Sequence, residues 1–191
     1  MEEQGKQIKQ EHKTSLSGGM IVDKTNLRVE LRGRLDSLNA MVVELQIRGE
    51  QQGLISLVEE LEELGGKLHD IFLCEVTGKA CGDLFLWGMS SDEIRERSHY
   101  PERYFGLGHI RSHYTMGPIA AGLNMLRTQI REAELSACRA FAVPPKPLNT
   151  EDEKIDRTDI IKVLNRLSSA AYILTYKYLP DGYDKTVRFS R

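Results

Sequence analysis

Three charged side chains, spaced four and then three residues apart, are the best candidates in this sequence for a chemical role. They are Arg127, Arg131 and Glu134. On a helix this spacing places them on one face, bordering an apolar stripe. Guanidinium groups are planar, permanently charged donor forks, so two of them beside a carboxylate could clamp a triphosphate. The alternative is a solvated helix face, where an arginine–glutamate pair contributes roughly 0.2–0.5 kcal/mol.

Further polar residues interrupt apolar stretches elsewhere in the chain. Asn165 and Arg166 lie in one such stretch, and Asp36 and Asn39 in another. Polar groups that border a core need hydrogen-bond partners. Asp36 could pair with an arginine across a helix interface or between subunits, or it could face water, and the spacing leaves these alternatives open.

The sequence does not predict a protein-bound metal site. Glu96 and His99 form one Glu-x-x-His step, whereas di-iron bundles need that step on two helices together with two further carboxylates. His109 and His113 are four residues apart, which is not a tight zinc-ligand pair of the Cys-x-x-Cys kind. We interpret these residues as mostly structural.

Known catalytic motifs are also missing. The sequence contains no G-x-x-x-x-G-K-[ST], no G-x-G-x-x-G and no G-x-S-x-G. A nucleotide site would therefore be unconventional. If the chain is an enzyme, the reacting nucleophile is expected to come from a cofactor.

Composition indicates a globular domain and argues against several classes of function. The 191 residues are 40% hydrophobic and 28% charged, with a net charge of -2, which is too balanced for a general nucleic-acid binder. Apolar runs stay shorter than the roughly 18–20 residues that span a bilayer. An odd set of cysteines, Cys74, Cys81 and Cys138, favours reduced thiols. We expect a cytoplasmic protein without nucleic-acid or membrane partners.

Four segments have apolar residues at helical spacing, and these segments could position Arg127, Arg131 and Glu134. They span about residues 27–49, 54–71, 119–141 and 160–178, and amphipathic helices of this kind cover one another's apolar faces. The predicted fold is all-α: a four- to five-helix up-and-down bundle. A long insertion with aromatic and glycine residues separates the second and third long helices.

Within the insertion, about residues 74–117, a short helix is expected to begin at Ser90-Ser91-Asp92-Glu93 and to be limited by Pro101. No persuasive strand pattern is present. Gly18 and Gly19 allow a tight turn in the lead-in. We divide the chain into a lead-in at 1–25, a bundle domain at 26–180 and a tail at 181–191.

Four stretches, taken together and in order, resemble the ATP:cob(I)alamin adenosyltransferases over roughly residues 13–175. The stretches are Thr14-Ser15-Leu16-Ser17-Gly18-Gly19; Leu27-Arg28-Val29-Glu30 with Gly33-x-x-Asp36-x-Leu38-Asn39; Leu126-Arg127-Thr128-x-x-Arg131-x-x-Glu134; and Leu164-Asn165-Arg166-Leu167-Ser168. Two further stretches, at 88–93 and 98–104, are more similar to the ethanolamine-utilisation branch than to the propanediol-utilisation branch.

The resemblance implies a helical homotrimer or homodimer that binds ATP and cobalamin near its subunit interfaces. The family transfers the 5′-deoxyadenosyl group of ATP to the cobalt of reduced cobalamin, which forms adenosylcobalamin and releases triphosphate. Cobalt(I) is the nucleophile, consistent with the missing protein nucleophile. The resemblance also implies Mg²⁺ with ATP, an electron-donating reductase and a B12-dependent enzyme as recipient of the product.

Site residues follow from the resemblance, motif by motif. Arg131 would contact phosphate, Glu134 would orient the nucleotide site and Asn165 would bind ATP. Asp36 would pair with Arg127 across the subunit interface. The lead-in would contribute to the ATP site through Lys13, Thr14, Ser15, Gly18 and Gly19. The aromatic insertion would supply the apolar wall that removes the lower axial ligand of cobalt.

The sequence departs from the family pattern in two places. The propanediol branch has a Thr-Gly-Asp-x-Gly phosphate loop where this chain has residues 8–12, Ile-Lys-Gln-Glu-His. Lys9 and Lys13 could substitute as point charges. The ethanolamine branch carries an upstream His/Cys metal motif without an equivalent here. The alternative function is a non-catalytic corrinoid carrier or regulator on the same fold.

Overall fold

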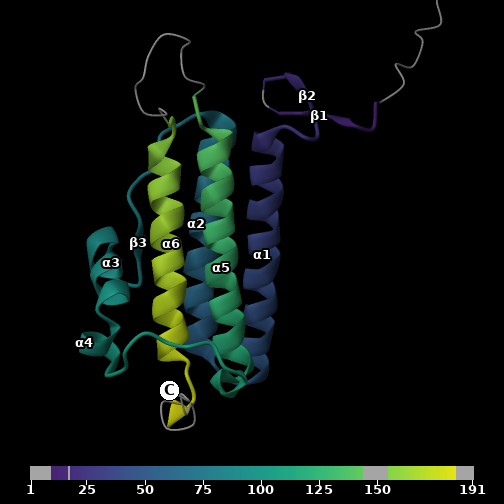
Figure 1. The fold of residues 1–191 in the computed structure, drawn as a ribbon. Helices are drawn as coiled ribbons and strands as arrows, with labels where there is room; N and C mark the ends of the chain where they lie inside the picture. The colour runs from purple at the N-terminus through teal and green to yellow at the C-terminus, as the bar shows by residue number, and fades with distance from the viewer. Residues whose placement is uncertain (1–9, 17, 144–154, 184–191) are drawn as a thin grey trace, which may run out of the picture.

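The computed structural model describes residues 10–16, 18–143 and 155–183, and four long helices dominate it. Lys9, a predicted phosphate contact, and most of the predicted tail lie outside these ranges. The long helices are α1 (Leu27–Gln51), α2 (Ile55–Thr77), α5 (Gly117–Ala140) and α6 (Thr158–Lys177) (Figure 1).

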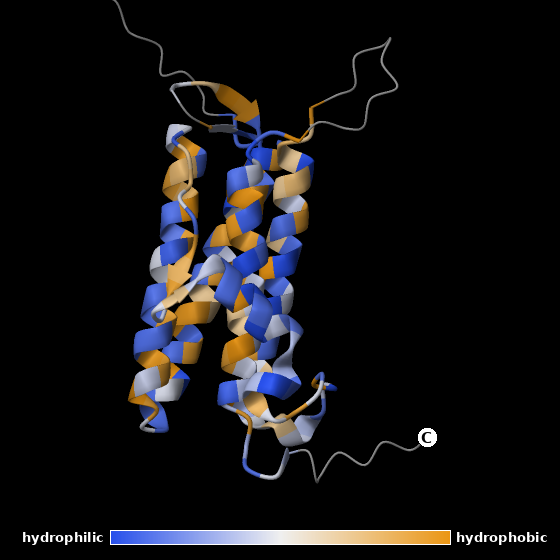
Figure 2. Cartoon of the chain, turned by 90° about the vertical axis from the view of Figure 1, so that its left-hand side faces the viewer, coloured by the Kyte–Doolittle hydropathy of each residue, from blue (hydrophilic) through white to orange (hydrophobic). Residues whose placement is uncertain are grey.

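The four helices pack into one bundle around a leucine-rich core. Helix α1 packs against α2 and α5, and α6 packs against α5 and α2. Figure 2 shows apolar and polar residues as stripes along each helix. The apolar stripes account for the buried residues: Leu31, Leu35, Leu38, Val42 and Leu45 of α1 are all at most 3% exposed. The predicted all-α bundle is confirmed.

The order of helix directions differs in one respect from simple alternation. Helix α2 ends beside the start of α6, where Arg157 donates to the Cys74 carbonyl, and α5 begins beside the end of α6, where Gly117 lies against Pro180. Helices α2 and α5 therefore run in the same direction, because the insertion carries the chain back along the bundle (Figure 1).

The insertion consists of short elements, of which α3 (Ser91–His99) packs against α6. It contains the hairpin of β3 (Phe85–Leu86) and β4 (Met89–Ser90), then α3, α4 (Pro101–Phe105) and the 3₁₀ turn η1 (Tyr114–Met116). Ser90 and Glu93 form a capping box at the start of α3. Pro101 is the first residue of α4. The predicted short helix and its limit are confirmed.

A second hairpin precedes the bundle, although the sequence predicted no strand. Strand β1 (Lys13–Ser15) pairs with β2 (Ile21–Asp23), and the Leu16 amide donates to the Met20 carbonyl at 2.9 Å. Strands this short carry too little alternation to be recognised. Gly18 and Gly19 adopt φ of +56° and +79°, which confirms the predicted turn.

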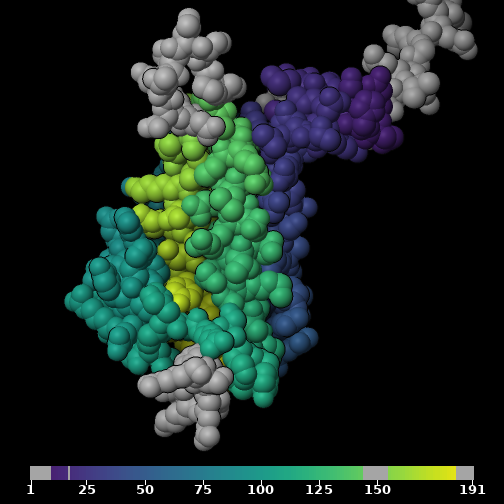
Figure 3. Space-filling view, in the orientation of Figure 1, coloured from purple at the N-terminus to yellow at the C-terminus, as the bar shows by residue number. Residues whose placement is uncertain are grey.

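This N-terminal hairpin projects from the end of the bundle at the start of α1, on the side away from α6 (Figures 1 and 3). Within the described ranges, no helix is long and apolar enough to cross a membrane.

Candidate functional site

A cavity of about 330 Å³ lies between α3, α5 and α6, with Arg127 and Arg131 in its wall. The other lining residues are Ser98, His99, His109, Ser168, Ser169 and Tyr172. Every one of these side chains can donate a hydrogen bond, and none is acidic. Such a lining suits an anion with many acceptor oxygens.

Arg127 is held in place from several sides. Its Nε donates to Asn124 Oδ1 at 2.9 Å, and its guanidinium carbon lies 5.2 Å from the centre of the Tyr172 ring. Asn124 in turn donates to Ser112 of the insertion at 3.0 Å. Burial, together with the nearby charge of Arg131, lowers the pKa of Arg127 from its usual value. Arginine side chains stay charged at neutral pH in proteins.

Two histidines of the insertion close the cavity from the side of α3. His99 Nδ1 lies 2.9 Å from the Arg95 carbonyl, and His109 Nδ1 lies 3.3 Å from Tyr172 Oη. Both histidines also line a neighbouring cavity of about 510 Å³ formed by α4 and the loop after it. The two cavities therefore share a wall.

Glu134 and Asn165 meet one helical turn beyond the cavity. Asn165 Nδ2 donates to Glu134 Oε1 at 2.9 Å, and Asn165 Oδ1 accepts from Arg166 Nη1 at 2.6 Å. The structure thus brings α5 and α6 together at the residues that the sequence singled out on each. The carboxylate is fixed by an amide of α6 and not by the arginines of its own row.

Other predicted site residues lie apart from the cavity. Asp36 is exposed on α1 and forms no ion pair with Arg127 within the described chain. Lys13, Thr14 and Ser15 form β1, followed by the glycine turn. The hairpin lies on the α1 side of the bundle, whereas the cavity lies between α3, α5 and α6 (Figure 1).

The Glu-x-x-His step on α3 is engaged in other contacts. Glu96 Oε1 accepts from Arg103 Nη1 at 3.0 Å and from Tyr104 Oη at 2.6 Å. Among the described residues, no group of three or more histidine, cysteine, aspartate or glutamate side chains could hold a metal ion.

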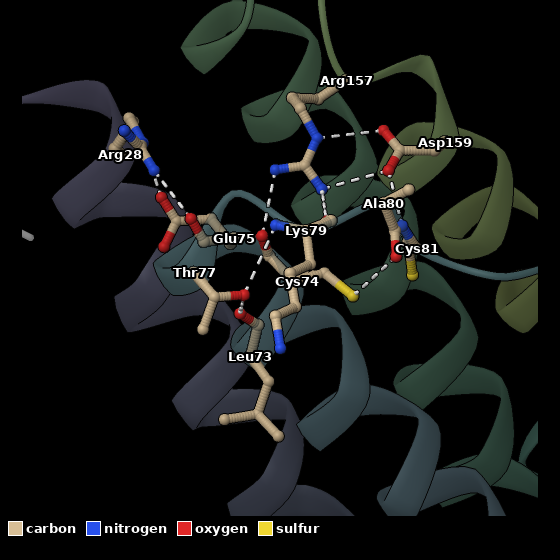
Figure 4. A network of polar contacts seen from close by, with 10 residues as sticks. All are labelled: Arg28, Leu73, Cys74, Glu75, Thr77, Lys79, Ala80, Cys81, Arg157 and Asp159. Carbon is tan, nitrogen blue, oxygen red and sulfur yellow. Dashed lines mark hydrogen bonds and ion pairs between the residues drawn. The ribbon is translucent and has the colours of Figure 1, made fainter.

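Cys74 and Cys81 lie close together at the end of α2. Cys74 Sγ contacts the Ala80 carbonyl at 3.6 Å (Figure 4). Burial and the neighbouring Cys74 thiol raise the pKa of Cys81 from 9.0 to about 12. The Cys81 thiol therefore stays protonated at neutral pH and is a weak nucleophile.

The sequence did not predict the roles of several residues. Tyr172, His99 and His109 contribute to the cavity only because the insertion folds against α6. Glu75 is another case, since it is fully buried. A signal for Glu75 was present, because it lies four residues after Ile71 and so continues the buried stripe of α2.

Comparison with known proteins adds an independent observation. A family model described as cobalamin adenosyltransferase matches residues 7–178. The chain is 33% identical over 165 residues to the corrinoid adenosyltransferase EutT of Escherichia coli (strain K12), and 32% identical to that of Salmonella typhimurium (strain LT2). These alignments cover 84% of this chain and 56% of each relative, so the chain spans about half the length of the curated relatives it matches.

Proposed function

Because the chain belongs to the cobalamin adenosyltransferase family, we propose that it transfers the 5′-deoxyadenosyl group of ATP to the cobalt of a reduced corrinoid. In this reaction the electron pair of cobalt(I) forms a bond to C5′ of ATP. The bond between C5′ and its oxygen breaks, and the electron pair leaves with triphosphate. The products are adenosylcobalamin, when cobalamin is the corrinoid, and triphosphate.

The cavity that contains Arg127 and Arg131 is the observation that carries this proposal. The leaving group is a polyanion, and the cavity presents two guanidinium groups together with imidazole and hydroxyl donors and no carboxylate. Donors fixed in a partly buried site stabilise the charge that develops on the leaving group. Arg127 is pre-organised by Asn124 and Tyr172, so little reorganisation is needed when triphosphate forms.

Glu134 and Asn165 would orient the nucleotide one turn further along α5 and α6. The hydrogen bond between them restricts both side chains and leaves Oε2 of Glu134 as a further acceptor for ribose or adenine groups. We include Mg²⁺ in the proposal as the ion that accompanies ATP. A reductase would supply the electron that converts cobalt(II) to cobalt(I), and a B12-dependent enzyme would receive the product.

The active form in this proposal is a homo-oligomer, dimer or trimer. Strand β1, which consists of Lys13, Thr14 and Ser15, lies on the α1 side of the bundle (Figure 1), whereas Arg131 lines the cavity between α3, α5 and α6. If the hairpin and the arginine row bind one ATP molecule, the hairpin must come from a neighbouring protomer. The exposed Asp36 of one protomer would then pair with Arg127 of the next.

The direct test supplies the protein with Mg²⁺-ATP and chemically reduced cobalamin without oxygen. Absorption spectra then follow the corrinoid, and triphosphate is measured separately. We expect light-sensitive adenosylcobalamin and one triphosphate for each corrinoid converted. Absence of both products under these conditions would contradict the proposal.

A corrinoid carrier or regulator on the same fold gives a different result in the same experiment. It would bind cobalamin tightly, with neither adenosylcobalamin nor triphosphate forming. A helical protein that binds neither ligand would show no thermal stabilisation, whereas a ligand at 100 times its dissociation constant adds about 2.7 kcal/mol.

A further inference from the structure

The carboxylate of Glu75 is buried in the interface between α1 and α2. It is 0% exposed near the end of α2. Its Oε1 accepts from Arg28 Nε at 2.6 Å, and its Oε2 accepts from Arg32 Nε at 2.5 Å. An isolated buried carboxylate would be strongly unfavourable. The two arginines of α1 therefore supply the partners that this buried carboxylate requires.

The two arginines use their remaining donors differently. Arg28 Nη2 donates to the backbone carbonyl of Glu75 itself at 2.8 Å (Figure 4). Arg32 Nη1 instead donates to the backbone carbonyl of Leu16 in the N-terminal hairpin. Arg32 is thus the member of the pair that connects the buried carboxylate to the hairpin.

The Leu16 contact lies directly beside the predicted nucleotide-binding residues. Leu16 follows β1, is 6% exposed, and its amide closes the hairpin onto Met20. Its carbonyl is held by Arg32, so both polar groups of this peptide segment are fixed. The position of Lys13, Thr14 and Ser15 relative to the bundle therefore depends on Arg32.

One donor of Arg32 remains without a partner. Its Nη2 is buried and has no hydrogen-bond partner among the described residues. A buried donor without a partner reduces stability, so this donor adds nothing to the stabilisation that the contacts with Glu75 and Leu16 provide.

We propose that Arg32, anchored by Glu75, is a positioning residue that fixes the N-terminal hairpin for binding the polyphosphate of ATP. This inference rests on the proposed function, because it assumes that the hairpin binds ATP. Arg28 shares the carboxylate but not the Leu16 carbonyl, and it provides a matched control.

The test compares Arg32→Gln with Arg28→Gln in the full chain. Hydrogen exchange measured by mass spectrometry reports the order of the hairpin, residues 13–23, without any substrate. We expect exchange in this segment to become about 10-fold faster in Arg32→Gln and to stay near wild type in Arg28→Gln. We expect the KM for ATP to rise about 10-fold in Arg32→Gln alone, with the KM for cobalamin and the kcat close to wild type.

Equal effects of the two variants on hairpin exchange would overturn the proposal, because both lose one partner of Glu75. Should Arg32→Gln fail to fold, Arg32→Lys carries the same test: it keeps a charge for Glu75 but lacks the fork that reaches Leu16 as well. Faster hairpin exchange without a change in the KM for ATP would also overturn it.

Failure of the proposed function is detected separately. If the chain forms no adenosylcobalamin, ATP binding is followed by titration calorimetry of wild type and Thr14→Ala. Equal affinities would show that the hairpin does not bind ATP, whereas the exchange data would still report whether Arg32 orders the hairpin.

Discussion

Arg127 and Arg131 lie one helical turn apart on α5, but their environments differ. Arg127 is half-buried and bonded to Asn124. Arg131 is exposed and forms no hydrogen bond or ion pair within the described part of the chain. An arginine whose donors are free at the edge of an anion cavity can give all of them to a ligand. We therefore expect Arg131 to contribute to phosphate binding and little to stability.

The corresponding prediction concerns Arg131→Ala. Its kcat/KM for ATP should fall about 100-fold or more, because one charged donor to the leaving group is lost. The melting temperature should remain within about 2 °C of wild type, since an exposed side chain without partners is removed. Steady-state kinetics and calorimetry measure the two quantities.

Arg139→Ala is the matched control on the same helix. Arg139 is 52% exposed and pairs with Glu30 at 3.3 Å, away from the cavity. Its replacement should change activity less than about twofold, because exposed pairs contribute little. Similar activity losses in both variants would show that removing any positive charge from α5 lowers activity, and that the position of Arg131 in the cavity does not matter.

At the level of elements, Gly122 of α5 lies directly against Leu45 of α1. A Cβ atom built there would lie 2.6 Å from Cδ2 of Leu45. By contrast, Gly66 in α2 is exposed and has no atom within 4 Å of such a Cβ. The two helical glycines therefore have opposite structural roles: one allows close packing, and the other only weakens its helix.

We predict that Gly122→Val destabilises the protein by about 1–3 kcal/mol, because the added atoms overlap Leu45. Gly66→Ala should stabilise it by roughly 0.5–1 kcal/mol through helix propensity. Urea unfolding followed by circular dichroism measures both. A stabilising effect of Gly122→Val would refute the packing of α5 against α1.

The insertion is the element whose role the sequence described least. Its glycine and aromatic content indicated a functional segment, and the capping box at Ser90 was recognisable. The cavity wall formed by His99 and His109 depends on α3 packing against α6. This packing joins residues about 70 apart in the chain, for which local periodicity carries no information. The implied apolar wall for cobalt stays a prediction.

For the whole molecule, the separation of hairpin and cavity predicts complementation between protomers. The double variant Lys13→Ala/Thr14→Ala should be inactive alone because its hairpin is defective. The variant Arg131→Ala should be inactive alone because its cavity is defective. In mixed oligomers, some sites combine an intact hairpin from one chain with an intact Arg131 from its neighbour. One site of two in a mixed dimer, or one of three in a mixed trimer, is then intact, so isolated mixed oligomers should recover about one-half or about one-third of the wild-type activity.

Co-expression with two affinity tags isolates the mixed oligomers for this measurement. A mixture of Arg131→Ala with Arg127→Ala is the control, because both changes affect the same cavity and no intact site can form. Failure of the hairpin and arginine variants to complement, in oligomers shown to be mixed, would mean that each site lies within one chain.

The division into lead-in, bundle domain and tail stays a prediction.

The sequence by itself determined the helices, the start of α3, the glycine turn and the ordered stretches that indicated the family. Each of these depends on residues near one another in the chain, through helical period, capping or backbone freedom. Only the tertiary structure decided that α2 and α5 run in the same direction, that Glu75 joins Arg28 and Arg32, and that two insertion histidines line one cavity with Arg127 and Arg131. Those contacts depend on how distant segments pack, because burial and hydrogen bonding between them are properties of the assembled bundle.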